Sequence, residues 1–168
     1  STSDRYILLH FLSSKEVGEF SVAYSIGSLV LFFPMVIGVV LPPLLAKIED
    51  GNLLLKKYDI ILINIKFYLI ISIPFVFGSY AIGDSIALIF SNLSTSMAIK
   101  YVIPLLSLSA LFNGITVIFN EVLFVKLQTL KMFKILLVTI AVNISLNLLF
   151  FSYYNDIIFA AISSLIAF

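Results

Sequence analysis

The chain has 168 residues, of which 61% are hydrophobic and only 11% are charged, and its mean hydropathy is +1.17. Soluble domains carry about 25% charged residues and cannot bury so much apolar surface, so a soluble enzyme and a disordered tail are excluded. The net charge of +1 also excludes the basic surface of a nucleic-acid-binding module. The composition therefore predicts an integral membrane protein that contacts the lipid bilayer.

Apolar runs long enough to cross a membrane follow one another along the chain. A spanning helix needs about 20 apolar residues, and windows of that size give four complete spans and a partial span at each end. The runs lack the alternation of a transmembrane β-strand, so we expect an all-α, polytopic bundle of transmembrane helices. The spans cover about residues 1–12, 17–45, 60–80, 98–125, 132–152 and 157–168.

Three apolar pieces are too short to be complete spans. Residues 81–90 follow the third span and are expected to lie at the membrane interface. The runs at residues 1–12 and 157–168 are also short of a full span. We therefore expect the chain to be a single transmembrane unit taken from a longer protein.

Lysines gather in two of the loops between the spans. Because the spans alternate in direction, the loops at 46–59 and 126–134 lie on one side, and the turns at 13–16, 91–96 and 153–156 lie on the other. The first side carries six lysines and the second carries two: Lys47, Lys56, Lys57, Lys126, Lys131 and Lys134 against Lys15 and Lys100. Since positively charged loops stay inside the cell, the loops at 46–59 and 126–134 are predicted to be cytoplasmic.

Two consecutive spans carry polar residues at helical spacing. They are Asn113, Thr116 and Asn120 in the fourth span and Thr139, Asn143 and Asn147 in the fifth. Amides that face lipid would lack hydrogen-bond partners, so both faces are expected to meet other helices or a wet cavity. Hydrogen bonding between helices and a hydrophilic transport path are the two interpretations that the pattern leaves open.

Prolines interrupt the second span. Pro34 and Pro42 lie eight residues apart and free backbone carbonyls, so they are expected to kink the helix or to act as hinges. A hinge suits a protein that alternates between two states, whereas prolines also occur in static membrane helices.

Among the ionisable residues of the expected spans, three are candidates for a polar interior. A charged side chain in the bilayer normally points inward and has a function. Arg5 is the candidate for binding an anion, because its guanidinium fork matches phosphate oxygens. Asp4 is expected to pair with a neighbouring helix or to moderate the charge of Arg5. Lys66 either reaches the headgroups or faces a cavity.

The residues for enzymatic chemistry are missing. The chain has no cysteine and one histidine, His10, which excludes disulfides, thiolate metal sites and a zinc-ligand cluster. It also lacks a phosphate-binding glycine loop and paired catalytic carboxylates. We expect no metal, no cofactor and no enzymatic activity, so movement of a substrate across the membrane is the expected function.

Several segments resemble those of a known transporter family. They are Asp4–Leu8, Glu16–Ser25, Val40–Leu44, Pro104–Leu106, Asn143–Leu149 and Ala160–Ile162. In this order they resemble helices seven to about twelve of the oligosaccharide flippases of polysaccharide biosynthesis, the Wzx-type branch of the MOP exporter superfamily. One departure is the turn at Tyr154–Ala161, which lacks the family's glycines.

The resemblance implies one lobe of a two-lobe transporter that rocks around a cationic cavity. It implies a bacterial inner-membrane protein that moves a lipid-linked oligosaccharide, on undecaprenyl pyrophosphate, from the cytoplasmic to the outer leaflet. The implied partners are an N-terminal lobe of the same chain and the polysaccharide polymerase machinery. The cavity candidates are Asp4, Arg5, Lys66, Asn113, Asn120, Asn143 and Asn147.

Rival functions remain open at this point. A multidrug or cation antiporter of the same superfamily would use inward carboxylates, whereas this chain offers at most Asp4 and Glu121 deep within the spans. A lipid II flippase is expected to carry more Arg and Lys in its cavity. A membrane glycosyltransferase would need longer extracytoplasmic loops, and a purely structural subunit is the last alternative.

Overall fold

The computed structural model describes residues 2–50, 54–91, 97–154 and 156–168. Along these residues it contains helices and no strand. The elements are α1 (Thr2–Phe11), α2 (Ser14–Gly27), the 3₁₀ turn η1 (Ser28–Leu31), α3 (Phe32–Asp50), α4 (Leu54–Ser91), α5 (Met97–Val125), α6 (Thr129–Tyr153) and α7 (Ile157–Ala167). The all-α bundle predicted from the hydropathy pattern is therefore confirmed.

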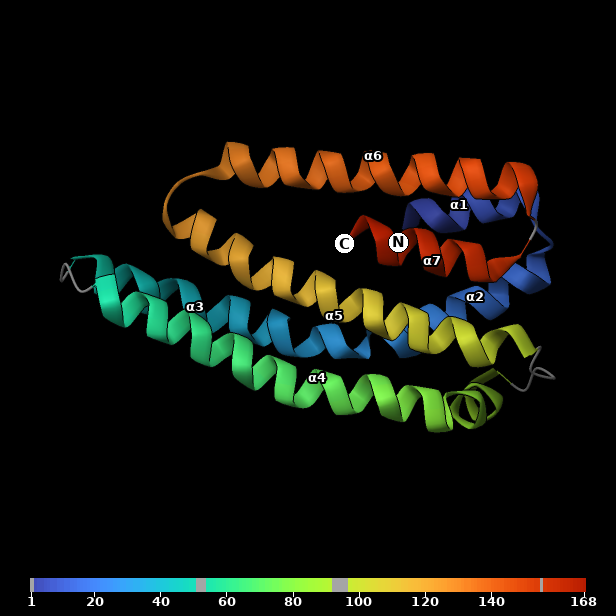
Figure 1. The fold of residues 1–168 in the computed structure, drawn as a ribbon, viewed down its shortest axis with the longest axis horizontal. Helices are drawn as coiled ribbons and strands as arrows, with labels where there is room; N and C mark the ends of the chain where they lie inside the picture. Colours follow the sequence, from blue (N-terminus) through green and yellow to red (C-terminus); the bar gives the residue numbers. More distant parts are fainter. Residues whose placement is uncertain (1, 51–53, 92–96, 155) are drawn as a thin grey trace.

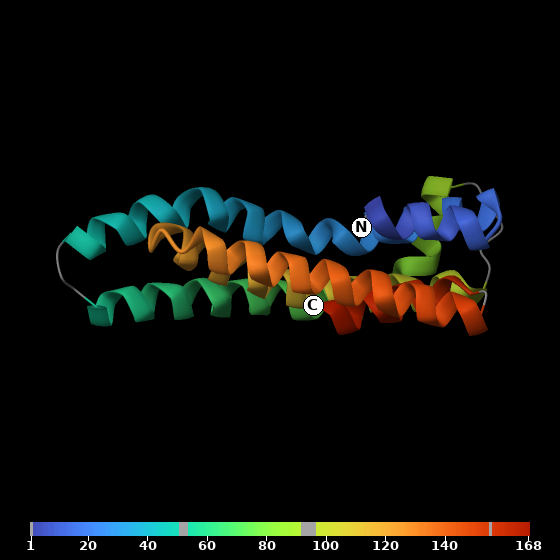
Figure 2. The same cartoon turned by 90° about the horizontal axis from the view of Figure 1, so that it is seen from above.

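The helices form an elongated bundle around α5. Helix α5 packs against α2, η1, α3, α4, α6 and α7. The short helices α1 and α7 lie along one half of the bundle, and the two chain ends come close to its middle (Figures 1 and 2). Figure 1 also shows that α3 meets α4 at the same end as α5 meets α6, whereas α1–α2, α4–α5 and α6–α7 meet at the opposite end.

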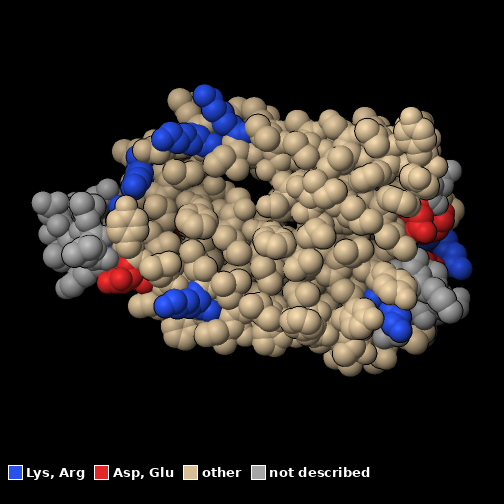
Figure 3. Space-filling model, viewed as in Figure 1, with Lys and Arg blue, Asp and Glu red and all other residues tan. Residues whose placement is uncertain are grey.

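Among the residues that the structure describes, four helical segments are long and apolar enough to cross a membrane, which makes this a multi-pass membrane protein. They are Ser14–Lys47, Lys57–Gly83, Ile99–Val125 and Thr129–Tyr153. On the face shown in Figure 3, charged side chains gather toward the two ends of the bundle, and a broad middle band carries none. This separation places the charges in water and the band in lipid.

Local side-chain caps turn the chain at one end of the bundle. Ser13 and Glu16 form a capping box before α2: the Ser13 backbone N–H donates to Glu16 Oε2 at 2.9 Å, and the Glu16 N–H donates to Ser13 Oγ at 3.4 Å. Asp156 Oδ1 accepts the Ile158 N–H at 3.0 Å and caps α7. These caps allow α1 to reverse into α2 and α6 to reverse into α7.

Of the two prolines expected to kink the second span, only Pro34 lies next to a break in the α-helix. Pro34 lies in the first turn of α3, where its missing N–H leaves no helical bond unmade, and η1 directly precedes that helix. The proline ring also crowds the carbonyl four residues earlier, at Val30, which lies inside η1. Helix α3 continues through Pro42 and Pro43.

The apolar piece expected at residues 81–90 is the last part of α4. Helix α4 continues unbroken to Ser91, since nothing after Pro74 removes a backbone N–H. Its final turns change direction and cross the end of the bundle (Figures 1 and 2). Gly83 lies at this crossing, where an added Cβ would approach Ile103 Cγ2 to 3.2 Å.

Two apolar cores lie one after the other along the bundle. The first joins α1, α2, the end of α4, the start of α5, the end of α6, and α7 around Phe20 and Ile103. The second joins η1, α3, α4 and α5 around Tyr68 and Leu41. Gly27 brings α2 against α5, since a Cβ there would approach Leu106 Cβ to 2.9 Å. The candidate site lies close to this crossing.

Candidate functional site

Five polar side chains form a buried hydrogen-bonded cluster between three helices. They are Asp4 of α1, Asn143 and Asn147 of α6, and Ser163 and Ser164 of α7. Asn147 Nδ2 donates to Asp4 Oδ1 at 3.1 Å and to Asn143 Oδ1 at 3.2 Å. Ser163 Oγ donates to Asn147 Oδ1 at 2.6 Å, and Ser164 Oγ donates to Asp4 Oδ2 at 3.5 Å. We call these five residues the Asp4 cluster.

The sequence explains why these side chains meet. Asn143 and Asn147 are four residues apart, so they share one face of α6. Ala160 and Ala161 are completely buried in α7, and such small residues let helices approach closely. Asp4 lies in the first turn of α1, where the helix dipole favours a negative charge.

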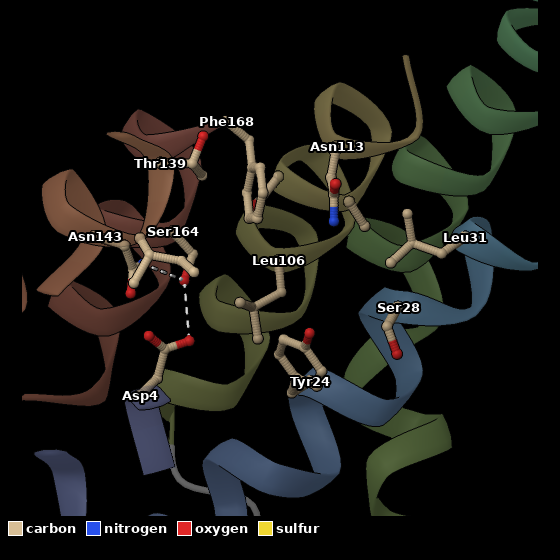
Figure 4. Close-up of a pocket in the computed structure, with 13 residues that line it drawn as sticks. Asp4, Tyr24, Ser28, Leu31, Leu106, Asn113, Thr139, Asn143, Ser164 and Phe168 are labelled. Atoms are coloured by element: carbon tan, nitrogen blue, oxygen red, sulfur yellow. Dashed lines mark hydrogen bonds between the residues drawn. The ribbon is translucent and has the colours of Figure 1, made fainter. Parts of the chain in front are cut away.

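A small cavity adjoins the cluster. Its volume is about 60 Å³, which is enough for a few water molecules. Asp4, Asn143 and Ser164 line one side, and Tyr24 and Ser28 line the other (Figure 4). The wall also contains Leu31, Leu106, Ser109, Ala110, Asn113, Thr139, Ile140 and Phe168. Polar groups from five helices and η1 therefore face one space inside the bundle.

The side chains of the Asp4 cluster suit a monovalent cation. They are a carboxylate, two amides and two hydroxyls, and their acceptor atoms are all oxygens. No group of three or more His, Cys, Asp or Glu side chains that could hold a metal ion occurs among the residues that the structure describes. A transition metal, which prefers nitrogen or sulfur ligands, therefore does not fit this cluster.

Arg5 lies in a separate, open recess. Successive side chains on a helix point about 100° apart, so Arg5 leaves α1 in a different direction from Asp4. The recess has a volume of about 430 Å³ and is lined by Arg5, Ser21, Val22, Ser25, Ile26, Leu29 and Ile86. The Arg5 Cζ atom lies 5.7 Å from the centroid of the Tyr24 ring, within cation–π range. We call this hollow the Arg5 recess.

Three of the predicted cavity residues join Asp4 around one space. Asn143 and Asn147 belong to the Asp4 cluster, and Asn113 lines the adjoining cavity. Asn120 lies two turns further along α5 and does not line that cavity. Lys66 is exposed on α4 and lines a different, apolar hollow with Leu69, Ile70, Ile73 and Pro74.

Several buried polar residues were not identified from the sequence. Ser163 and Ser164 complete the Asp4 cluster, and their signal was the small-residue run that begins at Ala160. Glu19 and Lys57 are also buried, at 3% and 5% exposure. The hydropathy pattern gave no sign of either, because both fall close to the ends of spans, where charges are expected.

Comparisons of the chain with protein-family models, curated proteins and solved structures returned no significant match.

Proposed function

We propose that the chain is one lobe of a membrane transporter that flips a lipid-linked oligosaccharide, on undecaprenyl pyrophosphate, from the cytoplasmic to the outer leaflet of a bacterial inner membrane. The resemblance of its sequence to the Wzx-type flippases supplies the substrate class. The observation that carries the proposal is the position of Arg5 in an open recess on the side of the bundle, at a level inside the membrane.

The depth of Arg5 follows from the length of α1. Arg5 lies six residues before Phe11, the last residue of α1, which is about 9 Å of helix. The hydrocarbon core is about 30 Å thick, so the guanidinium starts about a third of the way across it. An arginine at that depth is costly unless it contacts an anion or water, and such residues mark substrate paths.

The surroundings of Arg5 suit a phosphate group. The half-buried guanidinium offers a fork of N–H donors that binds phosphate oxygens in pairs. Ser21 and Ser25 line the same recess, although the Ser25 hydroxyl already donates to the Ser21 carbonyl at 2.9 Å. Tyr24 positions the guanidinium from one side. Because the recess is open, a pyrophosphate could contact the Arg5 guanidinium from the surface of the lobe.

The Asp4 cluster supports a coupling role. A carboxylate buried among amides and hydroxyls can bind a small cation, and binding changes the charge of the bundle interior. Transporters place such ion sites near the membrane middle. We propose that ion movement through this cluster drives the export step. The same cluster favours the second candidate function, a cation-coupled multidrug antiporter.

Substitutions at the two neighbouring residues test the proposal. In cells that depend on this protein for surface polysaccharide, Arg5→Ala is expected to abolish export at normal membrane abundance, and Arg5→Lys is expected to retain part of it. Lys66→Gln is the matched control, because Lys66 is exposed and lies outside both sites. Full export by Arg5→Ala at normal abundance would refute the role of Arg5. Loss of folded protein instead would indicate a structural role.

Asp4→Asn separates the two candidate functions. The substitution keeps the shape of the side chain and removes its negative charge. For a flippase, glycan export should fall and should no longer respond to the ion gradient, while resistance to cationic drugs stays at the level of cells without the protein. For an antiporter, wild-type cells should resist cationic drugs, and Asp4→Asn should remove that resistance with no effect on surface glycan.

A further inference from the structure

An apolar groove lies between α4 and α5, outside the Asp4 cluster and the Arg5 recess. It has a volume of about 570 Å³, and its walls include Val76, Phe77 and Tyr80 of α4 and Tyr101, Pro104 and Leu108 of α5. Phe77 is 71% exposed. These residues belong to the membrane spans Lys57–Gly83 and Ile99–Val125, so the groove opens toward lipid.

The groove begins where polar groups meet the membrane surface. Tyr80 and Tyr101 are about half exposed and lie close to the ends of the spans Lys57–Gly83 and Ile99–Val125. Tyrosine is typical of this level, because its ring packs in lipid and its hydroxyl reaches water. From Tyr101 to Leu108 the groove descends about 10 Å into the hydrocarbon. It therefore has a polar upper end and an apolar lower end, as a phospholipid has.

A lysine stands at the upper end. Lys100, Pro104 and Leu108 are spaced four residues apart and therefore lie along one face of α5. Lys100 is exposed and forms no ion pair with any side chain that the structure describes. Lys100 therefore lies at the level of Tyr101, one turn before Pro104 on the same face of α5.

We infer that this groove binds an anionic phospholipid. One acyl chain lies against Phe77 and Leu108, the phosphate contacts the ammonium of Lys100, and the two tyrosine hydroxyls lie at the level of the glycerol. The positive charge of Lys100 at the upper end of an apolar groove favours an anionic lipid over a zwitterionic one. A lysine close to the membrane surface gives about a fivefold preference for an anionic headgroup.

The absence of tryptophan from the chain allows a direct test. A Phe77→Trp variant places one fluorophore in the groove, and Leu149→Trp places one on a lipid-facing site of α6 that has no neighbouring lysine along the chain. Each variant is reconstituted in phosphatidylcholine vesicles with a small fraction of lipid brominated on its acyl chains, either phosphatidylglycerol or phosphatidylcholine. Bromine quenches tryptophan at contact range, so quenching reports which lipid occupies each site.

At Phe77→Trp, brominated phosphatidylglycerol is expected to bind about fivefold more strongly than brominated phosphatidylcholine, and at Leu149→Trp the two are expected to be equal. Adding Lys100→Gln to Phe77→Trp should remove the preference. Adding Lys15→Gln, which neutralises the other lysine at this end, should leave it unchanged. Equal quenching at Phe77→Trp, or a preference that persists without Lys100, would overturn the proposal.

Discussion

At the scale of single residues, the contact between Tyr68 and Gly114 joins α4 to α5. Tyr68 is 1% exposed, and its hydroxyl donates to the carbonyls of Ala110 and Leu111 at 3.2 and 3.1 Å. A Cβ at Gly114 would collide with the Tyr68 hydroxyl and would lie 3.0 Å from Pro34 Cγ. The phenol reaches the α5 carbonyls only because residue 114 has no side chain.

We therefore expect Gly114→Ala to destabilise the protein by about 1–3 kcal/mol, the usual cost of overpacking a core. Gly78→Ala is the matched control, because a Cβ at Gly78 meets nothing within 4 Å. Alanine is the better helix former, so that variant should be as stable as the wild type or more stable, by up to about 1 kcal/mol. Thermal unfolding in detergent compares the two variants. Equal stability would show that α4 and α5 separate freely at this point.

At the scale of the elements, the membrane span Ser14–Lys47 consists of two helices, α2 and α3, which are separated by the 3₁₀ turn η1. Ser28 and Leu31 belong to η1 and line the cavity beside the Asp4 cluster. A change in the direction of α3 relative to α2 would therefore change the cavity wall. Pro34, in the first turn of α3, holds the break in place by excluding a regular helix through Val30.

Replacing Pro34 by alanine restores an N–H and removes the ring, so α2 and α3 are expected to join into one straighter helix. Cysteines at Lys15 and Lys47, both exposed, accept spin labels without competition because the chain has no cysteine. We expect the distance between the labels to increase in Pro34→Ala. Pro43→Ala, inside the continuous part of α3, should leave it unchanged. An unchanged distance in both variants would show that other contacts set the break.

The helices could be predicted more fully than the sites. The run expected at 98–125 corresponds to α5 at Met97–Val125, because hydropathy averaged over a span is insensitive to single residues. The face of each helix was harder to predict, because apolar side chains face both lipid and protein. Asn143 and Asn147 could be grouped by their spacing, since amides must avoid lipid. Lys66 could not be placed, because a lysine stem reaches water from a lipid-facing position.

Asp4 and Arg5 also show that the direction of a side chain around its helix is hard to predict from the sequence. Both were predicted cavity residues because they fall within an expected span and in the segment Asp4–Leu8 that carries the family resemblance. In the structure, the rotation of α1 directs Asp4 into a closed cluster and Arg5 into an open recess. Ser163 and Ser164 were missed because a hydroxyl in an apolar helix can bond to its own backbone, as Ser163 does to the Ala160 carbonyl.

At the scale of the whole molecule, the lysines distinguish the two ends of the bundle. Lys47, Lys126, Lys131 and Lys134 are all exposed at or near the end where α5 meets α6. Lys15 and Lys100 are exposed toward the opposite end. During insertion, lysine-rich loops remain on the cytoplasmic side of the membrane. The asymmetry therefore predicts the orientation of the entire chain.

Single cysteines at the two ends test this orientation. Leu130, 77% exposed, follows the α5–α6 connection, and Ser14 is exposed beside the α1–α2 connection. In intact cells, a membrane-impermeant maleimide should label Ser14→Cys and leave Leu130→Cys unlabelled, and both should react once the membrane is permeabilised. Since the chain has no native cysteine, unsubstituted protein gives the background. The reverse labelling pattern would place the lysine-rich end outside the cell and would contradict the predicted orientation. Labelling of both positions in intact cells would mean that the chain inserts in two orientations.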